Sequence, residues 1–147
     1  MSNAEMYMLF AKQSKKTVDI KRLTARLDKY FSEYVRRRDA DKNGVVRCCT
    51  CNTPHHWKDI DAGHFVSRDR KATRWDKKNV HPQCQYCNRF RSGEQHKHGL
   101  YIDKRYGAGT AQQLQDISRI RGCKVDNGWI LIMIEDMKKE IKKINNK

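Results

Sequence analysis

Acidic side chains and long apolar runs are both scarce in this sequence. Its 147 residues include 17 Asp and Glu against 32 Lys and Arg, and only 37% are hydrophobic. The longest apolar run, Trp129 to Ile134, is far shorter than the roughly 20 residues that a transmembrane helix needs. Residues Met1 to Phe10 also lack the basic start and apolar stretch of a secretory signal. These absences favour a protein of the reducing cytoplasm.

The low apolar content predicts a thin core that burial alone stabilises poorly. A chain of 147 residues is the size of one domain. We therefore expect one active module, fastened by a structural metal ion. The six cysteines suit this interpretation, because in a reducing compartment cysteines are more often metal ligands or free thiols than disulfides.

The charge balance points to a polyanionic partner. The formal net charge is +15, and the basic residues are spread over the whole chain rather than over one amphipathic helix. This distribution favours nucleic acid over a membrane surface. Composition does not distinguish DNA from RNA.

Helical periodicity marks both ends of the chain. Thr17 can cap a helix over residues 17–39, where apolar residues recur at three- and four-residue steps. Asn43-Gly44 predicts a tight turn after it. Two more helices are expected, over Thr110–Arg121 and about Trp129–Ile144. We divide the chain into an N-terminal basic helical extension (1–44), a central module (45–100) and a C-terminal helical region (101–147).

Two Cys-x-x-Cys pairs bracket the central module. Each pair can form a tight turn with both sulfurs on one side, so together they suit a tetrahedral structural Zn²⁺. The predicted ligands are Cys48, Cys51, Cys84 and Cys87. Cys49 competes with Cys48 for one place, but Cys49-x-Cys51 is a poorer chelating turn, so we interpret Cys49 as a free thiol.

The residues between and just after these pairs carry a recognisable pattern. His64, Asn79 and Asn88 follow one another at separations of fifteen and nine residues. This order resembles the His-Asn-His/Asn core of the ββα-metal nucleases. The flanking cysteine pairs are similar to those of phage Holliday-junction resolvases of the endonuclease VII type, where an asparagine also follows the last cysteine.

A closer resemblance is to the phage NinG/Rap recombination-protein family. The chain shares with it the runs Asp61-Ala62-Gly63-His64-Phe65 and Asn79-Val80-His81 and the stretch from Cys87-Asn88 to Ser92-Gly93. The likeness covers roughly residues 23 to 115 and is most specific in the centre. The resemblance implies a phage- or prophage-encoded protein, working in a bacterial host cell with other phage recombination proteins.

The resemblance also implies a fold and an activity. The expected fold class is α+β, with a small zinc-stapled ββα-metal (HNH/His-Me finger) core over residues 45–100, flanked by N-terminal and C-terminal helices. The expected activity is that of a metal-dependent HNH endonuclease acting on branched or single-strand-containing DNA. The alternative is a non-catalytic zinc-stabilised protein that only binds nucleic acid, and an RNA-binding role also stays open.

Hydrolysis of a phosphodiester needs an activated water and a counter-charge for the leaving oxygen. A neutral histidine accepts a proton near physiological pH, so His64 is the candidate general base. The family analogy assigns Asn79 the role of bracing the loop. His81 is a further candidate, either facing the ion or phosphate or as a structural histidine.

The catalytic ion is expected to be Mg²⁺ or Mn²⁺, because these ions prefer hard oxygen ligands such as the amide of Asn88. Many relatives carry Asp or His directly before the base, where this chain has Gly63. Side chains alternate along a strand, so Asp61 faces the same side as Gly63. We therefore predict Asp61 as the second ligand of this ion.

Polar and basic residues around this centre are the expected DNA contacts. They lie in the loop after His64 and in the segment after Asn88, and they are Arg68, Arg70, Lys71, Arg74, Arg89, Arg91, Ser92 and Lys97. Such contacts neutralise phosphates without reading sequence. The remaining histidines, His55, His56, His96 and His98, are interpreted as surface residues or phosphate contacts. The apolar stretch from Trp129 to Met137 suits either a homodimer surface or core packing.

Overall fold

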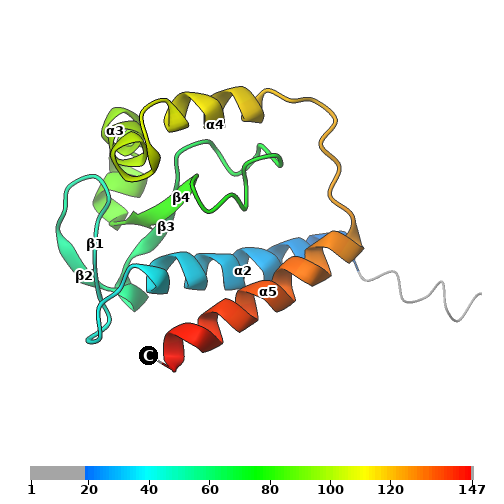
Figure 1. Ribbon diagram of the computed structural model, residues 1–147, viewed down its shortest axis with the longest axis horizontal. Helices are drawn as coiled ribbons and strands as arrows, with labels where there is room; N and C mark the ends of the chain where they lie inside the picture. Colours follow the sequence, from blue (N-terminus) through cyan, green and yellow to red (C-terminus); the bar gives the residue numbers. More distant parts are fainter. Residues whose placement is uncertain (1–18, 147) are drawn as a thin grey trace, which may run out of the picture.

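Helices enclose two small β-sheets in the computed structural model, which describes residues 19–146 (Figure 1). The chain is therefore a mixed α/β protein. In chain order its elements are α2 (Ile20–Arg38), β1 (Val45–Arg47), β2 (Pro54–His56), the 3-10 helix η1 (Trp57–Asp59), β3 (Asp61–His64), β4 (Val80–Gln83), the π-helical turn η2 (Tyr86–Phe90), α3 (Gln95–Tyr106), α4 (Thr110–Ser118) and α5 (Asn127–Asn145).

Both sheets are antiparallel and two-stranded. Strand β1 pairs with β2, and Val46 lies opposite His55. Strand β3 pairs with β4 in a register that sets Asp61 opposite Gln83 and Gly63 opposite His81. Strands of three and four residues are marginal by themselves, so both hairpins depend on what packs around them.

The main core lies between the first and last helices, which run side by side (Figure 1). They run in the same direction, since Ile20 and Ile130 line one pocket while Arg37 bonds to Asn145 at the other end. Their facing apolar residues recur every three or four positions. Buried residues of this core are Leu23, Leu27, Phe31, Tyr34, Val35, Trp75, Val80, Ile130, Ile134, Met137 and Ile141.

A second apolar cluster lies on the other side of the β3–β4 hairpin, under α3 and α4. Phe65 and Val66 follow β3 directly and pack against Ile102 of α3 and Leu114 of α4. The hairpin is thus held between the α2–α5 pair and the α3–α4 pair, as Figure 1 shows. The residues that leave β3 are buried on both sides, which positions His64 at the strand's end.

The predicted helices are confirmed, with corrected ends. The first begins at Ile20 rather than at residue 17, and Asp19 caps it by accepting a hydrogen bond from the Lys21 amide. Thr17, the predicted cap, lies outside the described residues. The helix predicted to reach Arg121 ends at Ser118.

The Asn43-Gly44 turn is confirmed as well. Gly44 has φ +76°, a left-handed conformation that favours glycine. Asp41 closes the turn by accepting hydrogen bonds from the amides of Asn43 and Val45.

Core packing accounts for one face of the apolar stretch from Trp129 to Met137. Ile130, Ile134 and Met137 are buried against α2, whereas Leu131 and Ile132 are exposed. None of the helices within residues 19–146 is both long and apolar enough to span a bilayer.

The packing of α2 on α5 predicts the effect of a truncation. Leu27 is fully buried, so Leu27→Ala should lower the free energy of unfolding by about 2–5 kcal/mol. Leu131 on α5 is 44% exposed, so Leu131→Ala should change it by less than about 1 kcal/mol. Urea denaturation followed by far-UV circular dichroism measures both. Equal losses for the two variants would contradict this account of the core.

Candidate functional site

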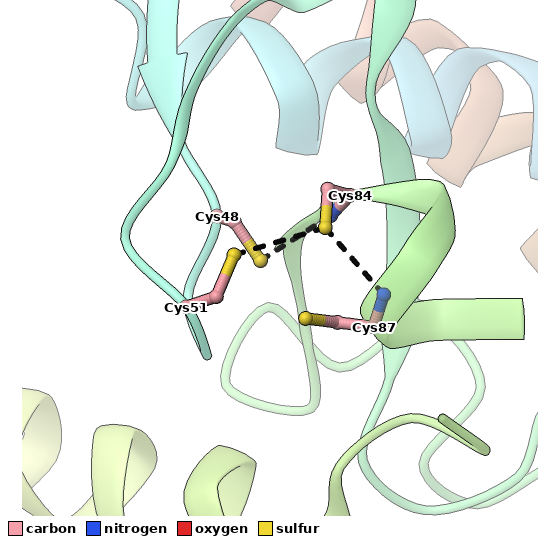
Figure 2. A group of neighbouring side chains, drawn as sticks. All are labelled: Cys48, Cys51, Cys84 and Cys87. Atoms are coloured by element: carbon pink, nitrogen blue, oxygen red, sulfur yellow. Dashed lines mark hydrogen bonds between the residues drawn. The ribbon is translucent and has the colours of Figure 1, made fainter. Parts of the chain in front are cut away.

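Four cysteine sulfurs converge at one point between the two hairpins (Figure 2). The Sγ atoms of Cys48, Cys51, Cys84 and Cys87 all lie within 4.8 Å of one another. Four sulfurs bound to a tetrahedral Zn²⁺ at 2.3 Å lie about 3.8 Å apart, and Cys51 and Cys84 are separated by 3.8 Å. The cluster therefore fits a structural zinc ion, and the predicted set of four is the set that the structure brings together.

Local backbone turns aim these sulfurs inward. Cys48 and Cys51 occupy the turn between β1 and β2, where the Asn52 amide donates to the Cys48 carbonyl. Cys84 follows β4 and Cys87 lies in η2, and the Cys87 amide donates to the Cys84 sulfur at 3.5 Å. The Cys84 amide donates to the Cys48 sulfur at 3.3 Å, so the two turns also contact each other directly.

Cys49 does not join this cluster. Burial works against the Cys48 thiolate, but hydrogen bonds from the backbone and from Thr50 outweigh it and lower the pKa of Cys48 to about 6. Burial instead raises the pKa of Cys49 well above its ordinary value. Because the Cys49 sulfur lies outside the cluster of four, Cys48 is the ligand of the two.

Asp61 and Asn88 come together beside the cysteine cluster. The Asn88 side-chain amide donates to the Asp61 carboxylate at 2.9 Å, although the two residues are 27 positions apart. The Arg89 guanidinium also binds this carboxylate through two hydrogen bonds, of 2.8 and 2.9 Å. The Asp61 side chain is mostly buried and that of Arg89 is mostly exposed. The two predicted ligand residues thus meet through the Asn88 nitrogen, with an arginine neutralising the carboxylate.

His64 ends β3 and contacts a different partner. Its Nε2 lies 3.0 Å from the Arg74 carbonyl, which can only accept, so Nε2 carries the proton and Nδ1 keeps a lone pair. Burial lowers the pKa of His64 below its ordinary 6.5, although the bond to Arg74 opposes this shift. The imidazole is therefore neutral near pH 7. Strand alternation places it on the face of β3 opposite to Asp61.

Asn79 is fully buried, and its side chain bonds only to the backbone of the loop between β3 and β4. Its Oδ1 accepts from the Val66 amide at 2.7 Å. Its Nδ2 donates to the carbonyls of Val66 and Thr73, both at 3.0 Å. These bonds close the loop that carries the Arg74 carbonyl, the partner of His64.

An acidic residue of α2 holds the same loop from outside. Asp28 accepts hydrogen bonds of 3.0 and 2.6 Å from the Arg74 guanidinium and one of 2.9 Å from the Trp75 indole. Arg74 is a predicted DNA contact, and in the structure its guanidinium forms this ion pair. The sequence does not show whether a basic loop residue is unpaired at the surface or forms an ion pair with a distant helix.

His81 lies in a buried cluster rather than beside Asp61 and Asn88. Its Nδ1 is 3.1 Å from Nε2 of His98, and its Nε2 is 3.2 Å from the Tyr106 hydroxyl. Both histidines are fully buried, so the expectation that His98 lies at the surface is wrong. Burial, reinforced by neighbouring positive charge, lowers the pKa of His81 to about 2, and burial lowers that of His98 to about 4.

The structure also brings Gln83 next to Gly63. The sequence alone did not identify Gln83 as a site residue. Gln83 is fully buried at the end of β4 and faces the same side as Asp61, its partner in the register. A Cβ atom at Gly63 would lie 2.3 Å from the Gln83 Oε1, so the glutamine occupies the space that a side chain at position 63 would fill. The signal in the sequence was the glycine directly before His64.

The other predicted DNA contacts lie at the surface. Arg68, Arg70 and Lys71 are exposed, and no ion pair of their side chains is found within residues 19–146. Arg91 and Lys97 are exposed as well and share Glu94 as an ionic partner. Ser92 is exposed and has φ +50°.

Two exposed aromatic side chains were missed by the sequence analysis. Phe90 is 78% exposed and Tyr86 is 61% exposed, and both belong to η2, the element that also carries Asn88 and Arg89. Large apolar side chains exposed together next to cations are typical of a binding surface.

Comparison with known proteins assigns a relationship to the whole described chain. Residues 8–147 match the family described as Bacteriophage Lambda NinG protein. Protein ninG of Salmonella phage P22 is 28% identical over 85 residues, which are 56% of this chain and 38% of the relative. Protein ninG of Escherichia phage 933W is also 28% identical over 85 residues, with 56% and 39% covered. The match spans less than two fifths of the length of these relatives. No solved structure matches the chain.

The cysteine cluster predicts which thiols hold zinc. Cys84→Ser should abolish stoichiometric zinc binding and unfold the centre, because metal binding supplies about 10 kcal/mol of folding free energy in small zinc modules. Cys49→Ser should keep one zinc per chain, since Cys49 lies outside the cluster. Atomic emission spectroscopy of the purified variants measures the metal. Loss of zinc in Cys49→Ser but not in Cys48→Ser would show that Cys49 is the ligand and Cys48 the free thiol.

The buried histidines predict acid sensitivity. Both pKa values are lower in the folded protein than the ordinary 6.5, so only the unfolded chain takes up protons as the pH falls below that value. Stability should be full above pH 6.5 and decrease below it, by about 1.4 kcal/mol per pH unit for each histidine.

His98→Gln keeps a hydrogen-bond donor toward His81. It removes one of the two imidazoles that take up a proton when the chain unfolds in acid. Its loss of stability between pH 6.5 and 5 should therefore be less steep than in the wild type by about one proton. Urea denaturation at several pH values measures this slope, and zinc loss contributes equally to both proteins. Identical slopes would show that His98 does not titrate with unfolding.

Proposed function

The chain belongs to the NinG family of bacteriophage proteins, and we propose that it is a metal-dependent endonuclease that hydrolyses phosphodiester bonds in DNA. One observation carries the proposal. A neutral histidine with a free lone pair ends the strand whose beginning holds the Asp61–Asn88 contact. Asp61 and His64 lie three positions apart, about 10 Å along a strand, and on opposite faces of β3. A DNA strand would therefore pass around the end of this strand to contact both.

His64 has the properties of a general base. The Arg74 carbonyl fixes its tautomer, and the bonds of Asn79 and Asp28 fix the loop that carries this carbonyl. The lone pair of Nδ1 is then available for the proton of a water molecule, whose oxygen attacks phosphorus while the bond to the leaving oxygen breaks. Because the pKa of His64 is lowered, the base is unprotonated at neutral pH.

Asp61 and Asn88 are the residues that would hold a divalent ion. A carboxylate and an amide oxygen suit Mg²⁺ or Mn²⁺, and such an ion would offset the charge that develops on the phosphate oxygens. Arg89 supplies positive charge at the same point and is exposed, so it can exchange its carboxylate partner for a phosphate.

Charge and exposed rings support DNA with unpaired bases as the substrate. The exposed cations Arg68, Arg70 and Lys71 belong to the loop that His64 begins, where they can neutralise a phosphate backbone. Phe90 and Tyr86 offer flat apolar surfaces, and base stacking on aromatic rings favours single-stranded segments. Branched or single-strand-containing DNA presents both features.

A non-catalytic zinc-stabilised nucleic-acid-binding protein is the second candidate. It is favoured by the pairing of Asp61 with Arg89 and by the position of His64 on the opposite face of β3. In this function the same cations and rings bind DNA or RNA, and the carboxylate serves only to orient Arg89.

A cleavage assay separates the two functions. With branched DNA and Mg²⁺ or Mn²⁺, His64→Ala should cut at least about 100-fold more slowly than the wild type, because a general base contributes that much or more. Added imidazole should restore part of the rate in this variant. Lys142→Ala, an exposed lysine on α5, is the surface control and should cut at the wild-type rate.

The pH profile gives an independent check. Cutting should persist at neutral pH and decline only as the pH falls below the lowered pKa of His64. Zinc content and thermal unfolding must match the wild type in each variant. Tight binding of DNA without cutting under any divalent ion would reject the endonuclease and support the binding protein, and stronger competition by RNA would point to an RNA ligand.

A further inference from the structure

Gln83 has a buried side-chain oxygen without a partner. The residue is fully buried, and its Oε1 makes no hydrogen bond to any atom within residues 19–146. Most buried polar atoms in proteins are paired, so an exception needs an explanation, such as an unseen ion or water.

The orientation of this amide is determined by its other end. Nε2 donates to the Gly93 carbonyl at 2.8 Å and to the Thr50 hydroxyl at 3.4 Å. A carbonyl can only accept, so nitrogen rather than oxygen must face Gly93. The Oε1 atom is therefore held toward Gly63, and a turn of the amide would set two acceptors against each other.

The absence of a side chain at Gly63 is what admits this oxygen. A Cβ there would lie 2.3 Å from Oε1 and 2.8 Å from the Gln83 Cβ, both closer than real contacts allow. The φ of Gly63 is not in the left-handed region, so the space, not the backbone conformation, requires glycine. An amide oxygen thus occupies the space beside the backbone of Gly63, directly before His64.

We propose that Gln83 supplies the third protein oxygen of the divalent-ion site, in place of the side chain that Gly63 lacks. Asp61 lies directly opposite Gln83 in the β3–β4 register, on the same face, and Cβ atoms of such pairs are about 5 Å apart. Asn88 contacts the Asp61 carboxylate through its Nδ2 at 2.9 Å, so a half-turn of this amide would direct Oδ1 to an ion bound by Asp61. Oxygens of Asp61, Asn88 and Gln83 would then hold the ion, with Gln83 at its buried end.

This inference rests on the ion site of the proposed function, but its test needs no DNA. Mn²⁺ is titrated into zinc-loaded protein, and the free ion is followed by electron paramagnetic resonance. Gln83→Met keeps the length of the side chain and removes the oxygen, so it should weaken Mn²⁺ binding by about tenfold or more.

Gln85→Met is the matched control, because Gln85 is exposed and its side chain caps nothing. It should bind Mn²⁺ as the wild type does. Wild-type affinity in Gln83→Met, or no Mn²⁺ binding by the wild type at millimolar concentration, would overturn the proposal. Mn²⁺ binding that depends on Gln83 in a protein that cuts no DNA would keep the proposal and remove the endonuclease.

A measurement on the unaltered chain covers the case in which the Gln83 variants fail to fold. Mn²⁺ broadens nuclear magnetic resonance signals near it, whereas Mg²⁺ does not. The Gln83 side-chain amide and the Gly63 amide should broaden at lower Mn²⁺ concentration than the side-chain amide of Gln112 on α4. Equal broadening at Gln83 and Gln112 would contradict the assignment.

Discussion

The convergence of four cysteine sulfurs is the constraint on which the centre of this protein depends. The β1–β2 and β3–β4 hairpins form separate sheets of three- and four-residue strands, too short to be stable alone. The cysteine cluster joins the turn of the first hairpin to the end of the second. Because Asn88 directly follows the last of these cysteines, the position of that sulfur also determines where Asn88 meets Asp61.

The helix α2 supplies the second constraint, and it acts on the histidine rather than on the cysteines. Its Asp28 holds Arg74 and Trp75, and the backbone carbonyl of Arg74 in turn sets the tautomer of His64. Near its C-terminal end, Arg38 donates to the carbonyls of Lys77 and Val80. The helix that the sequence suggested as a basic extension therefore holds the second half of the loop between β3 and β4.

Local spacing explains what could be predicted from the sequence. Two Cys-x-x-Cys turns carry their own geometry, so the four ligands and the exclusion of Cys49 followed from the chain alone. Apolar periodicity placed α2, α4 and α5 to within about three residues but did not mark α3, and strand alternation suggested that Asp61 rather than His64 would share a side with Gly63.

The features that the sequence did not predict depend on contacts between distant segments. The burial of His98 depends on α3 packing over β4, and the pairing of Arg74 depends on a residue 46 positions away. The role of Gln83 depends on the strand register, which sequence periodicity does not specify. None of these residues differs in type or local pattern from a surface residue.

The scarcity of acidic residues makes the placement of each carboxylate informative. Three aspartates each accept two hydrogen bonds from the guanidinium of an arginine that is distant in the sequence. These ion pairs are Asp28 with Arg74, Asp39 with Arg105, and Asp61 with Arg89. The first two pairs join different elements, and both of their side chains are moderately buried, as a structural role requires.

In the pair of Asp61 with Arg89, the arginine is largely exposed and the carboxylate is not. A pair that served only stability would gain little from an exposed arginine, because solvent screens the attraction. The arrangement keeps the Asp61 oxygens in place and leaves the Arg89 guanidinium accessible, as the proposed exchange of its carboxylate partner for a phosphate requires.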